Sequence, residues 1–227
     1  MNCASSGFGI VGRTFPAWTE DTQADAGSAS PNILHAIGRR WRAILAATLL
    51  ALAAWHFGHA AYIHAKARLA QHLIASAWQQ TKVHGAAVKP WPWADTWPIA
   101  RLTVPAHGVE LYILADSTGR SLAFGPGHLA DSALPGLPGR TVIVGHRDTH
   151  FAFMRNLKPG ESLRVEGRDG RKYQYAVRAS KVIGKRDLSA VADASETGLT
   201  LVTCYPFDSV SPNTPLRYVV EADLLPA

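Results

Sequence analysis

The sequence predicts an all-β domain preceded by one helix that crosses a membrane. From Ile99 onward, short β-branched and aliphatic runs alternate with Gly- and Pro-containing turns. No repeated helical pattern separates these runs, and upstream of them residues 43–65 carry no charge. Seven or eight short strands at this spacing predict a closed β-barrel or a β-sandwich.

Composition excludes several classes of protein. A chain of 227 residues is long enough for one domain and an appendage, and 47% apolar against 18% charged residues excludes a wholly disordered protein. The net charge is +6, but no block of five or six like charges occurs. This favours a moderately basic envelope protein with no nucleic-acid partner. The only cysteines, Cys3 and Cys204, cannot build a disulfide framework.

The N-terminal region predicts a leader and an anchor. Residues 1–38 are rich in Ser, Gly, Ala, Thr and Asp, and we expect a disordered cytoplasmic leader. Residues 39–65 predict a transmembrane anchor, because the 23 residues from Ala43 to Ala65 are uncharged and a helix of that length crosses about 30 Å of hydrocarbon. Three arginines precede the span, which places the N-terminus in the cytoplasm and the rest outside. They are Arg39, Arg40 and Arg42.

This span has two other interpretations. A cleaved signal peptide fits the small-residue pattern Ala51-Leu52-Ala53, but the preceding leader is long for one. A buried amphipathic helix disagrees with the length of the uncharged stretch. The histidines of the span have no acidic or cysteine residue beside them to complete a metal site, so we favour histidines that lie at the membrane interface. These are His56, His59 and His64.

Residues 66–98 predict a helical stalk and a connector. Leu69, Leu73, Ala77 and Trp78 are spaced to share one helix face. The Pro- and Trp-rich segment 89–98 predicts a rigid connector. Its tryptophans could bind sugar or lipid headgroups, although packing against the edge of the domain is favoured.

The β-domain is predicted over residues 99–227. Asp169-Gly170 between two β-like runs indicates a hairpin. Gly125-Pro126-Gly127 is interpreted as a loop and not as a phosphate-binding motif. The expected strands cover residues 99–104, 109–114, 141–144, 162–165, 172–183, 199–203 and 217–220.

Three residues at the ends of separate strands have the chemistry of acyl transfer. Cys204 ends the run Thr200–Cys204, His146 follows the run 141–145, and Arg217 lies in a third apolar run. A thiolate is the nucleophile, an imidazole can transfer the protons, and a guanidinium can donate to the oxyanion. Taken singly, they would be a buried core cysteine, a turn histidine and an edge-strand arginine; together they favour a catalytic site.

Other polar residues compete with these three. His107, His128 and His150 also lie in the domain, but His146 directly follows an apolar strand through a glycine. Asp148 and Asp208 are candidates for a fourth, orienting residue, without a pattern that favours either.

The pattern resembles the sortase family of cysteine transpeptidases. The resemblance covers residues 99–220 and rests on Thr-Leu-Val-Thr-Cys ending at Cys204, on the segment Pro135–Phe151 with Gly-His-Arg, and on the downstream strand arginine, Arg217. It implies an eight-stranded β-barrel with short helices, and a protein substrate with a C-terminal LPxTG-type sorting signal. It also implies cleavage between Thr and Gly, a thioacyl-enzyme on Cys204, and transfer to an amine.

Further details of the resemblance concern location and ligands. The anchor-first layout and Cys-Tyr-Pro-Phe-Asp after position 203 look most like the proteobacterial branch, class GN, which implies a single-pass inner-membrane protein with its catalytic domain in the periplasm. Arg140 stands where many relatives have asparagine, in a segment interpreted as a loop. No carboxylate cluster of the EF-hand kind occurs, so we expect no calcium requirement and no cofactor.

Two rival functions stay open from the sequence. A thiol hydrolase of the same fold would use water as the acceptor, and only product analysis with and without an amine separates the two. A non-catalytic envelope docking domain would keep its function in Cys204→Ala.

Overall fold

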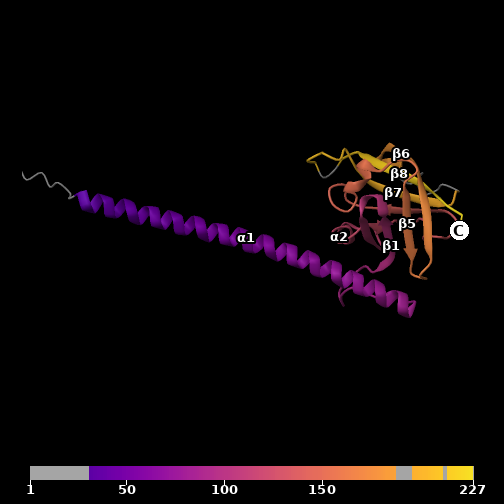
Figure 1. The fold of residues 1–227 in the computed structure, drawn as a ribbon, viewed down its shortest axis with the longest axis horizontal. Helices are drawn as coiled ribbons and strands as arrows, with labels where there is room; N and C mark the ends of the chain where they lie inside the picture. Colours follow the sequence, from indigo (N-terminus) through magenta and orange to yellow (C-terminus); the bar gives the residue numbers. More distant parts are fainter. Residues whose placement is uncertain (1–30, 188–195, 212–213, 227) are drawn as a thin grey trace, which may run out of the picture. The chain divides into compact units, whose positions relative to one another are not determined.

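Eight strands close into a barrel with the order β1-β2-β3-β4-β7-β8-β6-β5 (Figure 1). The computed structural model describes residues 31–187, 196–211 and 214–226. This confirms the predicted closed barrel and excludes the sandwich. The strands are β1 Pro98–Val104, β2 Val109–Leu114, β3 Gly127–His128, β4 Arg140–Val144, β5 Ser162–Gly167, β6 Lys172–Gly184, β7 Gly198–Tyr205 and β8 Leu216–Leu224.

The connections between strands contain only short helical turns. These are η1 Pro105–His107, α2 Gly119–Leu122, η2 Ala152–Asn156 and η3 Lys185–Asp187. Asp169-Gly170 forms the expected hairpin, since β5 and β6 pair antiparallel on either side of it. The prediction for 125–127 was wrong in part, because Gly127 begins β3 and pairs with Leu114 of β2. Arg140, expected in a loop, is the first residue of β4 and is buried.

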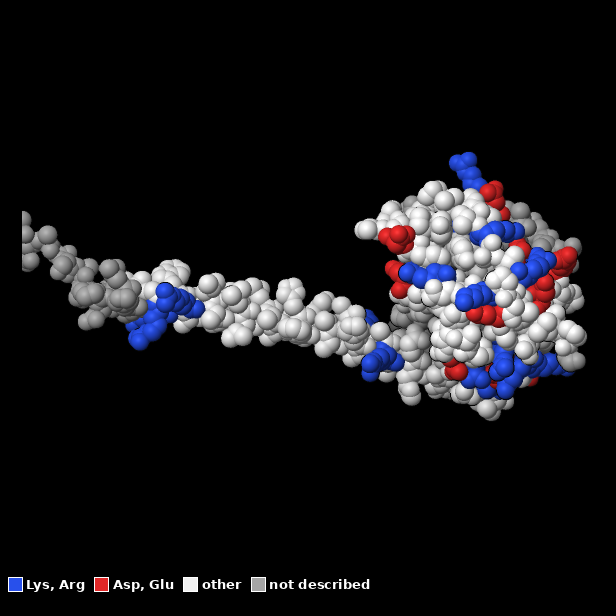
Figure 2. Space-filling view, turned by 45° about the horizontal axis from the view of Figure 1, so that its top comes forward, with Lys and Arg blue, Asp and Glu red and all other residues white. Residues whose placement is uncertain are grey.

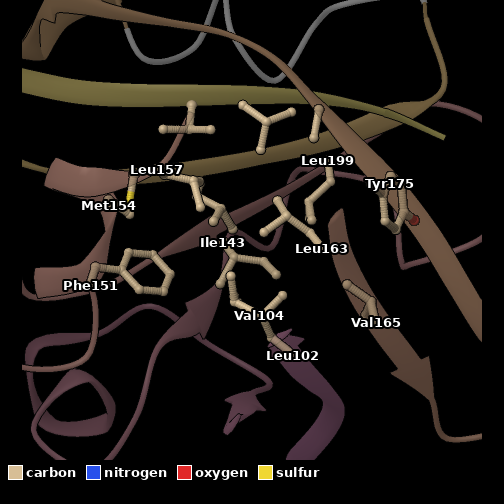
Figure 3. Close-up of a cluster of buried hydrophobic side chains, with 14 of the residues drawn as sticks. Leu102, Val104, Ile143, Phe151, Met154, Leu157, Leu163, Val165, Tyr175 and Leu199 are labelled. Atoms are coloured by element: carbon tan, nitrogen blue, oxygen red, sulfur yellow. The ribbon is translucent and has the colours of Figure 1, made fainter. Parts of the chain in front are cut away.

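The main core fills the barrel with inward-facing aliphatic and aromatic side chains. Leu102 and Val104 of β1, Ile143 of β4 and Leu163 of β5 are fully buried and lie together in Figure 3. A second, smaller cluster on another face contains Val142, Val202 and Val219. Because strand side chains alternate between faces, β4, β7 and β8 each contribute to both clusters. These three strands are therefore apolar on both sides.

Helix α1 runs from Pro31 to His84. Residues 31–38, which we expected to belong to the leader, are therefore helical, and residues 1–30 lie outside the described part of the chain. By length and composition, the helix from Ile37 is apolar enough to cross a membrane, with a hydropathy of 1.5 over its most apolar window. Figure 2 shows a charge-free stretch of this helix between two groups of basic side chains.

The C-terminal part of α1 packs against the folded domain through one stripe. Its buried side chains recur every three or four residues, as expected for one helix face. Trp78 and Ala77 belong to this stripe as predicted, but Leu69 does not, since it is 57% exposed. The stripe consists of Ala70, Ile74, Ala77, Trp78 and Thr81.

An ionic cluster joins the end of α1 to the barrel wall. The Glu166 carboxylate on β5 accepts from Lys82 of α1 at 3.2 Å and from Arg101 of β1. Burial by itself would raise the pKa of Glu166, but hydrogen bonds and charges from Lys82 and Arg101 outweigh it and hold the pKa below its ordinary value of 4.5. The ionised carboxylate therefore stabilises the fold.

Trp78→Ala tests whether the stalk helix is part of the domain. Trp78 is 0% exposed, so its truncation leaves a cavity and should lower the free energy of unfolding by about 3–5 kcal/mol. The measurement is urea unfolding of residues 66–227, followed by circular dichroism. Val83→Ala, at a position 79% exposed on the same helix, is the control and should change stability by less than about 0.5 kcal/mol. Equal effects of the two variants would contradict the packing.

Glu166→Gln tests the ionic cluster through pH. Because the folded-state pKa is lowered, the stabilisation is fully present above pH 4.5 and is lost as the pH falls through the folded-state pKa. Glu166→Gln should cost about 2 kcal/mol at pH 7, and the difference from the unmodified protein should shrink below pH 4.5. Glu110→Gln is the control, because Glu110 meets Arg101 at 3.3 Å but is 51% exposed. A penalty for Glu166→Gln that is independent of pH would argue against an ionised Glu166.

Candidate active site

Cys204 and Arg217 lie directly opposite each other on β7 and β8. The antiparallel ladder pairs Val202 with Val219 and Cys204 with Arg217. Opposite residues share a sheet face, and their Cβ atoms are about 4.5–5.5 Å apart in such pairs. Both side chains are partly exposed. The thiol and the guanidinium of the predicted site are thus neighbours on one face.

His146 lies next to this pair because β4 runs parallel to β7. Their ladder ends with Val144 opposite Val202, and the Gly145 N–H donates to the Val202 carbonyl at 3.1 Å. The Thr203 hydroxyl then donates to the Gly145 carbonyl, 58 residues away, at 2.7 Å. The same offset separates His146 from Cys204. His146 is exposed, and it lies just after the end of β4, beside the end of β7 that carries Cys204.

The turn after β4 requires glycine at position 145. A Cβ there would lie 2.8 Å from the Phe151 ring, which is fully buried in the barrel core. The Phe151 N–H also donates to the His146 carbonyl at 2.9 Å. The Phe151 ring packs against Gly145 and its N–H bonds to His146, so these two contacts fix the backbone of the histidine against the core.

The site is built on the smaller apolar cluster. Val202 comes two residues before Cys204 on β7, and Val219 comes two residues after Arg217 on β8. All four side chains therefore point to the same side. Both valines are fully buried against Val142. The functional groups thus stand at the open end of an apolar surface, while their neighbours Thr203 and Tyr218 point to the barrel interior side.

The guanidinium of Arg217 is held by backbone carbonyls. Its Nη1 donates to the carbonyls of Thr214 and Leu216, both at 2.7 Å. A guanidinium has five N–H donors. Among the described residues, only the Nη1 donors of Arg217 have partners, so donors remain for a ligand.

Arg147 is a functional candidate that the sequence reasoning missed. It is 8% exposed, and its Nη2 donates to the carbonyls of Ser209 and of Ser211, the latter at 2.7 Å. Its Nη1 donates to the Thr214 hydroxyl at 3.5 Å. No carboxylate within the described ranges pairs with it. The residue after the histidine therefore ties the segment between β7 and β8 to the turn after β4.

The other histidines have different surroundings. His128 is buried, and its Nε2 is 3.0 Å from the Ala133 carbonyl; His107 meets Glu161 at 2.8 Å. Neither histidine has Cys204 as its hydrogen-bond partner in the described residues. His150 is partly buried, which lowers its pKa; the charge of nearby His146 lowers it further, and Asp148 opposes the shift. His146 is therefore the histidine that the strand register brings to the cysteine.

The remaining candidates add little to the site. In the described part of the chain, neither Asp148 nor Asp208 hydrogen-bonds to His146. Nor do the described residues hold a group of three or more His, Cys, Asp or Glu side chains able to bind a metal ion. The Cys204 thiol is free; Cys3 lies outside the described residues. His56, His59 and His64 of α1 belong to no such group.

Aromatic side chains surround the end of β7. Tyr205 stacks on Tyr218 with ring centroids 6.1 Å apart, and Phe207 meets Tyr218 edge-on at 5.2 Å. Arg155 lies over the Phe207 ring at 5.2 Å. Sequence spacing could not assemble this cluster, since its members come from β7, the turn after it, β8 and η2.

Comparison with known proteins identifies the family of this domain. The sortase domain model matches residues 102–225. Sortase D of Bacillus subtilis is 36% identical over 120 residues, which cover 52% of this chain and 60% of that protein. Sortase A of Bacillus anthracis is 28% identical over 131 residues, covering 56% of this chain and again 60% of the relative. The chain thus spans about 60% of the length of these curated relatives.

Solved structures share the fold. Sortase A from Corynebacterium diphtheriae superposes with a TM-score of 0.53 at 27% identity, covering 60% of this chain and 64% of that one. A Clostridium perfringens sortase D5 transpeptidase gives a TM-score of 0.53 as well, at 24% identity, covering 65% of this chain and 88% of that one. Sortases are cysteine transpeptidases that act on proteins with a sorting signal. The match over residues 102–225, on an eight-stranded closed barrel, shows that this chain belongs to the sortase family.

Proposed function

We propose that this chain is a membrane-anchored transpeptidase that cleaves an LPxTG-like C-terminal sorting signal and transfers the product to an amine acceptor. The observation that supports the proposal is the β4–β7–β8 register, which puts Cys204 opposite Arg217 and the turn that carries His146 beside the end of β7. The alternative with water as the acceptor requires the same three groups and differs only in the second step.

Each residue has a defined role in the proposed reaction. The Cys204 thiolate attacks the carbonyl of the Thr–Gly bond and forms a C–S bond. The Arg217 donors stabilise the oxyanion of the tetrahedral intermediate. The C–N bond then breaks, and protonated His146 gives its proton to the leaving amine. In the second half, neutral His146 takes a proton from the incoming amine as it displaces Cys204 from the thioester.

The surroundings of the cysteine support an activated nucleophile. A thiolate is stabilised by nearby cations and is more reactive than a thiol. Arg217 lies opposite Cys204, and Arg147 anchors the next segment without a described carboxylate partner. Arginine is suited to the oxyanion role because its planar fork offers several donors in fixed geometry, unlike the point charge of lysine.

The location follows from the anchor. We propose that residues 43–65 cross the inner membrane once, with the N-terminus in the cytoplasm because three arginines precede them and only Lys66 and Arg68 follow closely. We also propose that the span is not cleaved, because the leader before it is long for a signal peptide. The barrel would then face the periplasm of a Gram-negative cell. The resemblance to the proteobacterial branch supports this assignment. A reporter fused after Ala227 should be active only in the periplasm.

The proposal predicts an acyl-enzyme on Cys204. Incubation with an LPxTG peptide should add the mass of its LPxT portion to Cys204, and an added amine should convert the adduct to a ligated product. Cys204→Ala should give no adduct. Arg217→Lys should form it about 10²–10³-fold more slowly, because an oxyanion donor is lost. Intact-protein mass spectrometry measures the rate of adduct formation in the unmodified protein, in Cys204→Ala and in Arg217→Lys.

The matched control is Arg168→Lys, the same substitution in the exposed turn after β5. It should react at the normal rate. Normal rates in folded Arg217→Lys would remove this arginine from the site. Peptide release that is unaffected by amine would favour the hydrolase, and envelope function retained by Cys204→Ala would favour a docking domain.

Arg147→Lys tests the anchor of the segment between β7 and β8. Lysine keeps the charge but cannot span the Ser209 and Ser211 carbonyls, so the variant should lose about 1.5–3 kcal/mol of stability. Amide hydrogen exchange in residues 207–211 should accelerate. KM for the peptide should rise more than kcat falls, since this residue positions and does not touch the reacting atoms. Unchanged exchange in these residues would contradict the anchoring role, and Arg168→Lys again serves as the control.

A further inference from the structure

A cleft distant in sequence from the proposed catalytic residues lies between α1, the Trp-rich connector and α2. It encloses 670 Å³ and is lined mainly by apolar side chains, among them Leu69, Leu73, Trp91 and Phe124. This volume is within the range of small-molecule sites. None of the lining residues belongs to β4, β7 or β8. The proposed acyl transfer therefore leaves the cleft unused.

The walls of the cleft are held in place by specific contacts. Gln71 of α1 donates to the Phe124 carbonyl at 2.6 Å, which ties the helix to the segment after α2. Trp91 meets the Phe124 ring edge-on, with centroids 5.1 Å apart. Ser121 of α2 donates to Asp116 at 2.8 Å, which fixes this short helix. The cleft is therefore part of the folded domain.

The charges at the cleft are mostly basic. Lys66 and Arg120 line it, and Asp95 is the one acidic residue of the lining. Arg120 and Asp95 meet at 3.3 Å with side chains 88% and 74% exposed, so their mutual attraction is weak in water. Both cations are thus available to an anionic group at the mouth.

The position along the chain identifies the kind of ligand. Lys66 is the first charged residue after the uncharged span 43–65, and it lines the cleft together with the next turn of the helix. Helix residues directly after a span lie at the membrane surface. Trp91 and Trp93 are the aromatic type that gathers at this level, and Trp93 is 80% exposed. The cleft therefore opens where phospholipids are.

We propose that the cleft binds one anionic phospholipid from the leaflet beside the barrel, with an acyl chain along Leu69, Leu73 and Phe124 and the phosphate between Lys66 and Arg120. This rests on the proposed membrane anchor. Lipid tails are as apolar in the bilayer as in the cleft, so chain transfer alone provides little selectivity. Selectivity comes from the headgroup, with about a five-fold preference for each cation near it.

The test uses the full chain in phosphatidylcholine nanodiscs that contain phosphatidylglycerol with a photoactivatable diazirine at the end of one acyl chain. After irradiation, peptides are mapped by mass spectrometry. We expect adducts on residues 43–65 and also on 66–73 and 120–124. Phosphatidylcholine with the same diazirine should label the span equally but the cleft at least five-fold less.

Two variants and one control decide the result. Leu73→Trp fills the cleft and should remove the cleft adducts while the span adducts persist; Val83→Trp, on an exposed part of α1, should leave both unchanged. Lys66→Glu with Arg120→Glu should abolish the preference for phosphatidylglycerol and keep the chain adducts. Circular dichroism checks that each variant is folded.

Three results would overturn the inference: span adducts without cleft adducts, cleft adducts that survive in Leu73→Trp, or equal labelling by the two lipids. Absence of span adducts would overturn both the inference and the membrane anchor. The acyl-enzyme assay on Cys204 is run on the same samples. Thioester formation without cleft adducts therefore rejects lipid binding alone.

Discussion

The parallel pairing of β4 with β7 is the constraint on which the rest of this structure depends. It joins Arg140–Val144 to Gly198–Val202 inside a barrel whose other long pairings are antiparallel. A shift of this register by one residue would turn every side chain of β7 to the opposite face and point Cys204 into the barrel core. The shift would also replace Leu199 and Leu201 in the barrel core by the smaller Thr200 and Val202, and the cavities left behind make it costly. The same packing that stabilises the barrel therefore also sets the position of the thiol.

Local patterns in the sequence were sufficient to place most strands but not to close the barrel. Strands such as β2, at Val109–Leu114, were predicted because alternating apolar residues end at turn residues. Strand β3 was missed, because two residues beside Gly-Pro have no periodicity. Position 127 needs glycine because a Cβ there would lie 2.1 Å from the Asp116 carbonyl oxygen, and this close approach cannot be foreseen from a local pattern. Barrel and sandwich differ in which strands pair across long separations, and a local pattern carries no information on that choice.

The site divides in the same way. Cys204 and His146 could be proposed from sequence because each ends a recognisable apolar strand, and the face of Arg217 followed from alternation with Val219. Arg147 could not be, since a buried arginine whose partners are backbone carbonyls leaves no mark on the sequence of those partners. The face of α1 that packs on the barrel was shifted by one position, from Leu69 to Ala70, because a helical repeat fits several adjacent stripes and the barrel surface selects one.

The contact of α1 with the barrel has a consequence for where the proposed reaction takes place. The first buried residue of the stripe, Ala70, comes five residues after Ala65, the last residue of the uncharged span. A helix rises 1.5 Å per residue, so about 8 Å of helix separates the proposed membrane boundary from the first buried residue of the stripe. The buried stripe and the Glu166 cluster oppose any lengthening of this distance by local unfolding. The proposed anchor would therefore hold the domain close to the membrane, which raises its effective concentration toward a substrate that is itself held by a membrane segment.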